Sequence, residues 1–304
     1  MSAASRLLGS ATAVVGSLGV AGLAWGLTEA HLFTLREVTC PVLPAGREPL
    51  RVLHISDLHL LPRQRDKVAF VRELAELEPD LVINTGDNMA SQAGMGTALE
   101  ALDPLLDIPG AFVWGSNDYK APQFKNPFMY LLNGRSHRSG RQTDDLPWQE
   151  LGAALRERGW VDLTHQRHRL VVKGMRIDLR GTDDGHLDRD DYPQVAGPVA
   201  TDADLTLAVT HAPYLRLLDA MTADGVDVIF AGHTHGGQVC LPTGALITNC
   251  DLDTDRVKGL STHIAGGHTS WLHVSAGLGT SPFAPYRVFC RPEATLVTLT
   301  PRAG

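Results

Sequence analysis

The sequence predicts an α/β fold over residues 51–304, preceded by one apolar N-terminal segment. Short apolar stretches alternate with segments of helical periodicity in the first half, the second half is rich in strand-like stretches, and residues 7–27 carry no charge. A chain of 304 residues, 43% of them hydrophobic, can bury a large core. A disordered chain and a small disulfide-framed domain are therefore excluded.

The N-terminal segment is predicted to lie in a membrane. Residues 7–27 read LLGSATAVVGSLGVAGLAWGL, and about 20 apolar residues span the core of a bilayer. We therefore expect residues 1–30 to form a transmembrane helix, a single-pass anchor that places the domain at the membrane on the extracytoplasmic side. A cleaved signal peptide is one alternative, because the run is rich in Ala, Gly and Val and Arg6 provides a minimal positive n-region. A buried helix of a soluble domain is another, although its glycines would make it a poor helix in water. Residues 31–50 contain three prolines and are expected to form a tether.

The next elements follow in a regular order. Apolar strands are predicted at 51–56, 80–84 and 111–114, with helices at 67–77 and 98–106 between them. This β-α-β-α-β order favours parallel strands with right-handed crossovers. In the second half a hairpin turns at Lys173-Gly174, between 170–172 and 176–179, and further strands are predicted at 205–209, 226–230, 272–274 and 295–299.

Charge and motif spacing exclude several classes of protein. The net charge of −7 and the isoelectric point near 6.0 exclude nucleic-acid binding through bulk charge. The four cysteines contain no CxxC pair, which excludes a zinc ribbon and a thioredoxin motif. Asp251-x-Asp253-x-Asp255 resembles a calcium loop, but Arg256 occupies the position of the required glycine, so an EF-hand is excluded.

Polar residues follow five of the predicted strands at the point where each strand ends. The candidate ligands are Asp57, His59, Asp87, Asn117, His211, His233 and His235. Ligand sites of open α/β sheets lie at the carboxyl ends of the strands, so these side chains are expected to converge. Oxygen and imidazole donors suit divalent Mn, Fe or Zn. Seven donors exceed the needs of one ion and predict two divalent metal ions that share a carboxylate.

Each of these residues also has an ordinary interpretation. Asp57 or Asp87 alone would fit a turn or a helix cap, and His211 alone would fit a loop histidine. The His233-x-His235 pair is harder to explain in this way, because two imidazoles on one side of an extended segment suit metal ligation. Their joint occurrence after five strands favours the metal site.

These blocks resemble those of the calcineurin-like binuclear metallophosphoesterases, which read D-x-H, G-D, G-N-H-[DE], an isolated His and G-H-x-H. The likeness runs from about Arg51 to Leu299, and SDLHL and HVSAGLGTSPF are similar to the bacterial membrane-associated branch. The resemblance implies a β-sandwich of two mixed sheets flanked by helices. It also implies that Asp57, His59 and His235 hold one ion, that Asp87 bridges, and that His211 and His233 hold the other.

The third block departs from the family pattern, because it reads Gly115-Ser116-Asn117-Asp118. Without a gap, Ser116 stands at the ligand position and Asn117 at the position of the catalytic histidine. With a one-residue shift, Asn117 is the ligand, which we favour because an amide oxygen coordinates better than a hydroxyl. The catalytic imidazole is absent in both alignments. Asp118 and His211 are the remaining catalytic candidates, Asp118 as a general acid or as an orienting group.

The functional hypothesis is a metallophosphoesterase at the membrane that hydrolyses phosphoester or phosphoanhydride bonds. Its substrate would be a phosphate-containing small molecule or a lipid-linked or nucleotide-linked one, and no nucleic acid is expected. A non-catalytic metal-binding membrane protein is the alternative, because the catalytic histidine is missing.

Three further regions carry weaker expectations. Residues 120–147 form a long insertion, either a solvated loop or a cap over the site. Asp183-Asp184-Gly185 is interpreted as a turn at a strand end. His54 and His273 lie within apolar strands and are expected to pack in the core.

Overall fold

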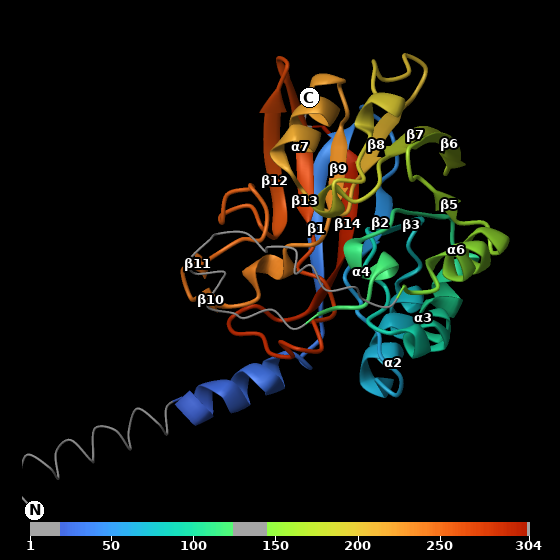
Figure 1. Cartoon of the computed structure of the whole chain (residues 1–304). Coiled ribbons are helices and arrows are strands. Elements are labelled where there is room, and N and C mark those ends of the chain that lie inside the picture. Colours follow the sequence, from blue (N-terminus) through green and yellow to red (C-terminus); the bar gives the residue numbers. More distant parts are fainter. Residues whose placement is uncertain (1–18, 124–144, 303–304) are drawn as a thin grey trace, which may run out of the picture.

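The computed structural model describes residues 19–123 and 145–302, which form two stacked six-stranded sheets with helices on their outer faces (Figure 1). The first sheet has the order β1 (Thr34–Leu43), β14 (Glu293–Pro301), β2 (Leu50–Ile55), β3 (Leu81–Asn84), β4 (Gly110–Phe112) and β5 (Val161–Asp162). Strands β2 to β5 are parallel, whereas β14 runs antiparallel to β2. The predicted parallel order of the first half is confirmed.

The second sheet is also mixed. Its order is β12 (Gly259–Ala265), β13 (His268–Val274), β9 (Val228–Ala231), β8 (Leu205–Val209), β7 (Met175–Gly181) and β6 (Gln166–Val172). Strands β7, β8, β9 and β13 are parallel, and the hairpins β6–β7 and β12–β13 add antiparallel edges. The α/β fold of two mixed sheets is therefore as the resemblance implied.

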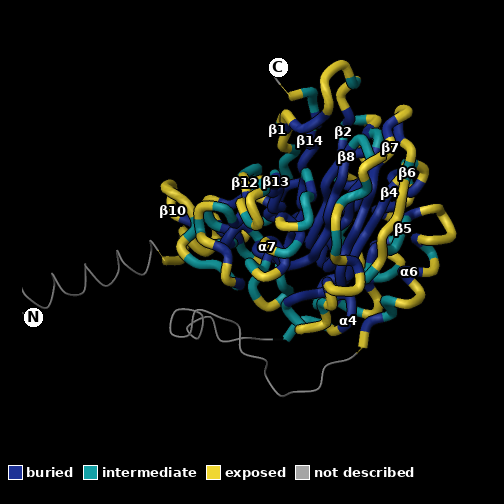
Figure 2. The backbone as a smooth tube through the Cα atoms, turned by 90° about the horizontal axis from the view of Figure 1, so that it is seen from above, coloured by how far each residue is buried: buried dark blue, intermediate teal, exposed yellow. Residues whose placement is uncertain are grey.

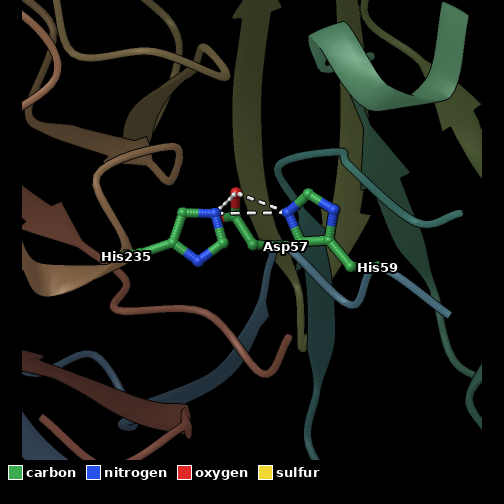
Figure 3. Close-up of side chains that lie close together, drawn as sticks. All are labelled: Asp57, His59 and His235. Atoms are coloured by element: carbon green, nitrogen blue, oxygen red, sulfur yellow. Dashed lines mark hydrogen bonds and ion pairs between the residues drawn. The ribbon is translucent and has the colours of Figure 1, made fainter. Parts of the chain in front are cut away.

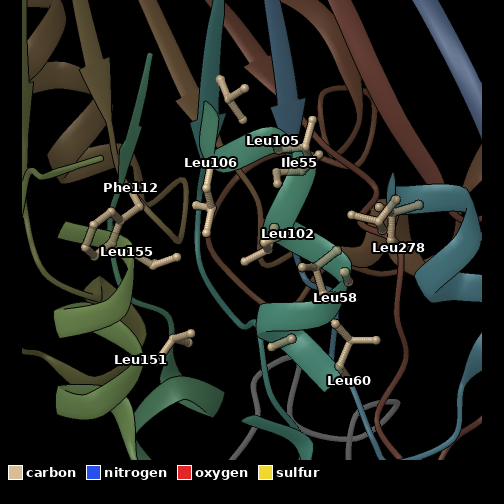
Figure 4. Packing of buried hydrophobic residues seen from close by; sticks show 14 of the residues in the cluster. Ile55, Leu58, Leu60, Leu102, Leu105, Leu106, Phe112, Leu151, Leu155 and Leu278 are labelled. Atoms are coloured by element: carbon tan, nitrogen blue, oxygen red, sulfur yellow. The ribbon is translucent and has the colours of Figure 1, made fainter. Parts of the chain in front are cut away.

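Three apolar clusters hold these layers together. Residues such as Val52, Ile83, Leu207 and Phe230 from both sheets fill the space between them. Helices α2 (Arg65–Glu73), α3 (Met95–Leu102) and α6 (Trp148–Glu157) cover the outer face of the first sheet through the cluster drawn in Figure 4. Helix α7 (Leu215–Ala223) covers the second sheet. Figure 2 shows the central strands in dark blue, because they are buried, whereas edge strands such as β6 are partly exposed.

The expected tether over residues 31–50 is wrong for its central part. Residues Thr34–Leu43 form β1, which pairs in parallel with β14 along nearly its whole length. Pro41 had argued against a strand, but β1 is an edge strand with one neighbour, so one side of its backbone needs no ladder hydrogen bond. β12 also escaped prediction, because only His263 among its residues is buried and no apolar run marks it.

The predicted membrane segment falls mostly outside the described residues. Residues 19–29 are helical and project from the domain (Figure 1). Within the described ranges, no helix combines the length and the apolar character needed to cross a membrane. The insertion expected over residues 120–147 likewise lies largely outside the described residues, although its ends meet where Lys120 pairs with Asp145.

Candidate metal centre

The five strand-end segments named from the sequence meet at one end of the sandwich. Three of them follow β2, β3 and β4 of the first sheet, and two follow β8 and β9 of the second. The site thus lies across two sheets instead of along the edge of one. Asp87 shows the convergence, because its carboxylate lies 3.5 Å from His59 Nε2 and 3.6 Å from His211 Nε2.

One group of donors consists of Asp57, His59 and His235 (Figure 3). His235 Nε2 lies 3.5 Å from Asp57 Oδ1, and the Nε2 atoms of His59 and His235 are 3.2 Å apart. Asp57 Oδ1 is buried and accepts no hydrogen bond from the described residues. A buried carboxylate oxygen that faces two imidazole nitrogens fits a divalent cation.

A second group consists of Asp57, Asp87 and His211, with His233 beside them. His233 Nδ1 lies 3.3 Å from His211 Nε2, and its backbone N–H donates to Asp57 Oδ2. The structure therefore places Asp57 close to both groups, whereas the resemblance assigned it to one ion. Asp87 lies between the groups, with Oδ2 toward His59 and Oδ1 toward His211.

Backbone acceptors orient two of the imidazoles. His211 Nδ1 donates to the Thr85 carbonyl at 2.7 Å, and His235 Nδ1 donates to the Gly279 carbonyl at 3.1 Å. These bonds place the proton on Nδ1, so that the Nε2 lone pair faces the donor groups. Metal-binding histidines are commonly oriented in this way.

The loops that carry the donors are strained. Five of the seven predicted ligands have a positive φ between 43° and 69°, namely Asp57, His59, Asp87, His233 and His235. This region of backbone space is uncommon for residues other than glycine, and such strain concentrates at functional sites. Gly115 keeps the loops close, because a Cβ there would lie 2.5 Å from His211 Cε1.

Burial and charge favour a cation at this position. Burial lowers the pKa of His59 well below its usual value, with a further contribution from His235, so His59 is neutral and able to bind a metal. Burial alone would also lower the pKa of His211. The carboxylates of Asp87, Asp184 and Asp57 raise it instead, to about 9. The acidic groups around His211 therefore attract positive charge.

Residues 115–118, the third block, form hydrogen bonds with the loop of Asp87. Asn117 donates to Asp87 through its backbone N–H and its Nδ2, both at 2.7 Å. Asp118 is fully buried and accepts from the N–H groups of Asp87, Asn88 and Gly115 at 2.7, 2.8 and 3.0 Å. Its carboxylate holds two ligand-bearing loops together. This role fits the orienting function considered from the sequence.

Several residues around the centre escaped the sequence interpretation. Asp184, expected to be a turn residue, is fully buried near His211. The ring of half-buried His186 lies 4.5 Å from that of His233, and its Nδ1 lies 3.2 Å from the Tyr214 hydroxyl. A histidine soon after a strand end was a usable signal for His186. Asp184 gave no signal that separates it from an ordinary turn residue.

His54 and His273 are buried in the core, as expected, but they are also connected to the centre. Their Nδ1 atoms lie 2.7 Å apart, and His54 Nε2 lies 3.0 Å from Thr85 Oγ1. Thr85 donates to the Ser56 hydroxyl, and Ser56 donates to Asp57. A buried chain of hydrogen bonds therefore ends on the carboxylate of Asp57, one of the candidate metal ligands.

Comparisons with known proteins agree with this geometry. A family model described as calcineurin-like phosphoesterase matches residues 50–237. The uncharacterized protein YpbG of Bacillus subtilis (strain 168) is 28% identical over 256 residues, which cover 84% of this chain and 82% of YpbG. Phosphodiesterase YaeI of Escherichia coli (strain K12) is 25% identical over 259 residues, covering 83% and 82%. A transmembrane protein with metallophosphoesterase domain from Bos taurus is 27% identical over 214 residues, covering 68% of this chain and 45% of its own length.

Proposed function

Since the chain belongs to the calcineurin-like phosphoesterase family and is a hydrolase of phosphoesters, we propose that it acts through two divalent ions, Mn, Fe or Zn, bound at the strand ends. The observation that carries this proposal is the position of Asp87. Its Oδ2 faces His59 and its Oδ1 faces His211, as a carboxylate shared by two ions requires.

The ligand assignment follows from the two donor groups. Asp57, His59 and His235 would hold one ion, and His211 and His233 the other, with Asp87 between them. Asn117 is the proposed amide ligand of the second ion, because its side chain lies beside Asp87. The orphaned Asp57 Oδ1 and the Nε2 lone pairs of His211 and His235 fit such ions.

The chain's own groups then position the substrate and handle its protons. When bound, two such ions lower the pKa of a bound water and neutralise charge on phosphoryl oxygens. Asp118 joins its own loop to the loop of Asp87 and Asn88, which makes it a positioning residue instead of a general acid. His211 would act as a ligand. His186 is the proposed hydrogen-bond donor to the phosphoryl or leaving-group oxygen, because the third block offers no imidazole.

The proposed substrate is a small phosphodiester or a lipid-linked phosphoester at a membrane surface. The name of YaeI supports a phosphodiester. The uncharged run over residues 7–27 supports a single-pass anchor, as does the likeness to a transmembrane protein of Bos taurus. We place the domain on the extracytoplasmic side, because few charges precede the run, as in an N-terminal signal anchor. The second candidate is a non-catalytic metal-binding membrane protein, favoured by the missing histidine of the third block.

Turnover by the full chain in detergent tests this proposal. Metal-free protein is loaded with Mn²⁺ and assayed on an aryl phosphodiester, an aryl phosphomonoester and a nucleotide pyrophosphate. We expect hydrolysis of at least one class, abolished by a chelator and restored by Mn²⁺. Protein that retains its metal but hydrolyses none of the three classes would contradict the enzyme and support the non-catalytic alternative.

A further inference from the structure

The helix of residues 19–29 is bound firmly to the domain. The Glu29 carboxylate is buried and accepts hydrogen bonds from the backbone N–H groups of Phe289 and Cys290, at 3.0 and 2.7 Å. Trp25 Nε1 donates to the same carboxylate at 2.8 Å, and the Arg287 N–H donates to the Gly26 carbonyl at 3.0 Å. The helix axis is therefore fixed relative to the domain.

Large apolar side chains are exposed around the base of this helix. Ten such side chains are exposed in the described part of the chain, and eight of them belong to the helix, to the hairpin β10–β11 (Cys240–Leu241 and Gly244–Ala245) with its flank, or to the loop before β14. We call six of them the apolar rim: Trp25, Leu27, Leu241, Leu246, Phe283 and Phe289. The two outside these segments, Val171 and Ile264, lie on the second sheet.

The segments of the apolar rim are joined to one another. Val239 pairs with Val288, and Gln238 Nε2 donates to the carbonyls of Ala284 and Tyr286 at 2.8 and 3.0 Å. Figure 1 shows the β10–β11 hairpin and the loop before β14 on the side of the domain from which the helix projects. The exposed residues thus surround the point where the N-terminal helix leaves the domain.

Phe289 shows that the rim is held open by the fold. Its side chain is 56% exposed although its φ is +51°, a strained value for a large aromatic residue. The two hydrogen bonds that the backbone N–H groups of this turn donate to the Glu29 carboxylate stabilise the conformation. Burial of the Phe289 side chain within the described domain therefore does not compensate for the strain.

We propose that the apolar rim rests on a lipid bilayer, so that the metal-bearing domain lies against the membrane in one orientation. This inference rests on the proposed membrane location and not on the chemistry of the metal centre. A bilayer is the expected occupant, because residues 7–18 precede the docked helix in the sequence, carry no charge and complete with it an apolar run of bilayer-spanning length. Aromatic residues such as Trp25 and Phe283 suit the interface between lipid and water.

The same contacts couple the membrane surface to the metal centre. Arg287, in the loop bound by the helix, is fully buried and donates to the Gly279 carbonyl at 2.7 Å. That carbonyl also accepts from His235 Nδ1, and Cys290 Sγ contacts the His235 carbonyl at 3.3 Å. The helix thus positions both the rim and a proposed metal ligand, which favours a substrate whose phosphoester lies at the membrane interface.

Depth-dependent quenching in vesicles tests the proposal. Leu246→Cys and Phe283→Cys, made singly in the full chain, are labelled with a polarity-sensitive fluorophore and reconstituted into phosphatidylcholine–phosphatidylglycerol vesicles. Val171→Cys and Ile264→Cys are matched controls, since both positions are exposed and apolar but lie outside the rim. The four native cysteines are buried, so the introduced thiol should be labelled selectively.

We expect headgroup-level spin-labelled lipid to quench the labels at 246 and 283 roughly threefold or more above the labels at 171 and 264. Equal quenching at all four positions would overturn the proposal. Fluorophores at 246 and 283 that stay shielded from water in detergent, without lipid, would show that two copies associate there and would also overturn it. Hydrolysis of a soluble phosphodiester by the same samples is measured in parallel. Active enzyme without lipid contact would refute only the proposed contact between the apolar rim and the bilayer. Lipid contact without turnover would refute only the proposed function.

Discussion

The metal centre and the N-terminal region differ in how their structure arises from the sequence. At the centre, the candidate ligands lie within about five residues of a strand end, and short local motifs such as Asp57-x-His59 mark most of them. In the N-terminal region, order comes from partners far along the chain, because Glu29 binds the turn at Phe289 and Thr34 pairs with Glu293. Candidate metal ligands can thus be recognised from short sequence motifs. Contacts between residues far apart in the sequence, such as Glu29 and Phe289, leave no periodic pattern in the sequence.

The largest expected effect is at the carboxylate between the two donor groups. Asp87→Asn should lower metal-dependent turnover by more than about 100-fold, since loss of a residue that merely supports a ligand already costs 10–100-fold. Steady-state kinetics with Mn²⁺ measure this, and Asp202→Asn, an exposed carboxylate paired with Arg169, is the matched control. A fall of less than tenfold would contradict the shared-carboxylate assignment.

The next effect tests whether the N-terminal region is part of the fold. Glu29→Gln should lower the free energy of unfolding by about 1–3 kcal/mol, because the buried N–H groups of Phe289 and Cys290 lose a charged acceptor. Chemical denaturation of the full chain in detergent measures it. Glu76→Gln, at an exposed position, should change little. If both variants unfold alike, the helix and the domain are separable and the contrast between the two regions fails.

The role of Asp118 can be separated from general acid catalysis by the leaving group. Asp118→Asn should lower turnover by roughly 10–100-fold, since Asp118 supports the loop of the proposed ligand Asp87. We expect the same fold loss for aryl phosphodiesters with good and with poor leaving groups. A loss that grows as the leaving group becomes poorer would show that Asp118 protonates it.

The smallest expected change in metal occupancy and rate distinguishes Asn117 from Ser116 as the ligand of the third block. Asn117→Ala should lower metal occupancy and rate, because the Asn117 side chain lies beside Asp87, whereas Ser116→Ala should change either by less than about twofold. Elemental analysis and kinetics on both variants give the ranking. The reverse ranking would place Ser116 at the ligand position and would support the gapless alignment.

Much of the sandwich could be predicted because its strands are buried. β8 lies at the predicted residues 205–209, and β2 is displaced by one residue from the predicted 51–56. β1 and β12 were missed because edge strands show little apolar alternation. The predicted helices over 67–77 and 98–106 each end in 3₁₀ turns, at Leu74–Leu77 and Asp103–Asp107.

The candidate ligands could be named from the sequence because each lies soon after a predicted strand and all except His211 belong to a short motif. Their supporting partners could not. The carbonyls of Thr85 and Gly279 orient His211 and His235, but a backbone acceptor has no side-chain signature. Buried Arg287 stands between half-buried Tyr286 and Val288 in the sequence, and only the fold brings it to the loop of Gly279.

The number and coupling of the ions test the central claim most directly. Metal-free full-length protein is titrated with Mn²⁺ and followed by electron paramagnetic resonance. The proposed sharing of Asp87 predicts saturation at two ions per chain, with the multiline spectrum of an exchange-coupled pair. Saturation at one ion per chain, with the six-line spectrum of an isolated Mn²⁺, would contradict the two-ion centre.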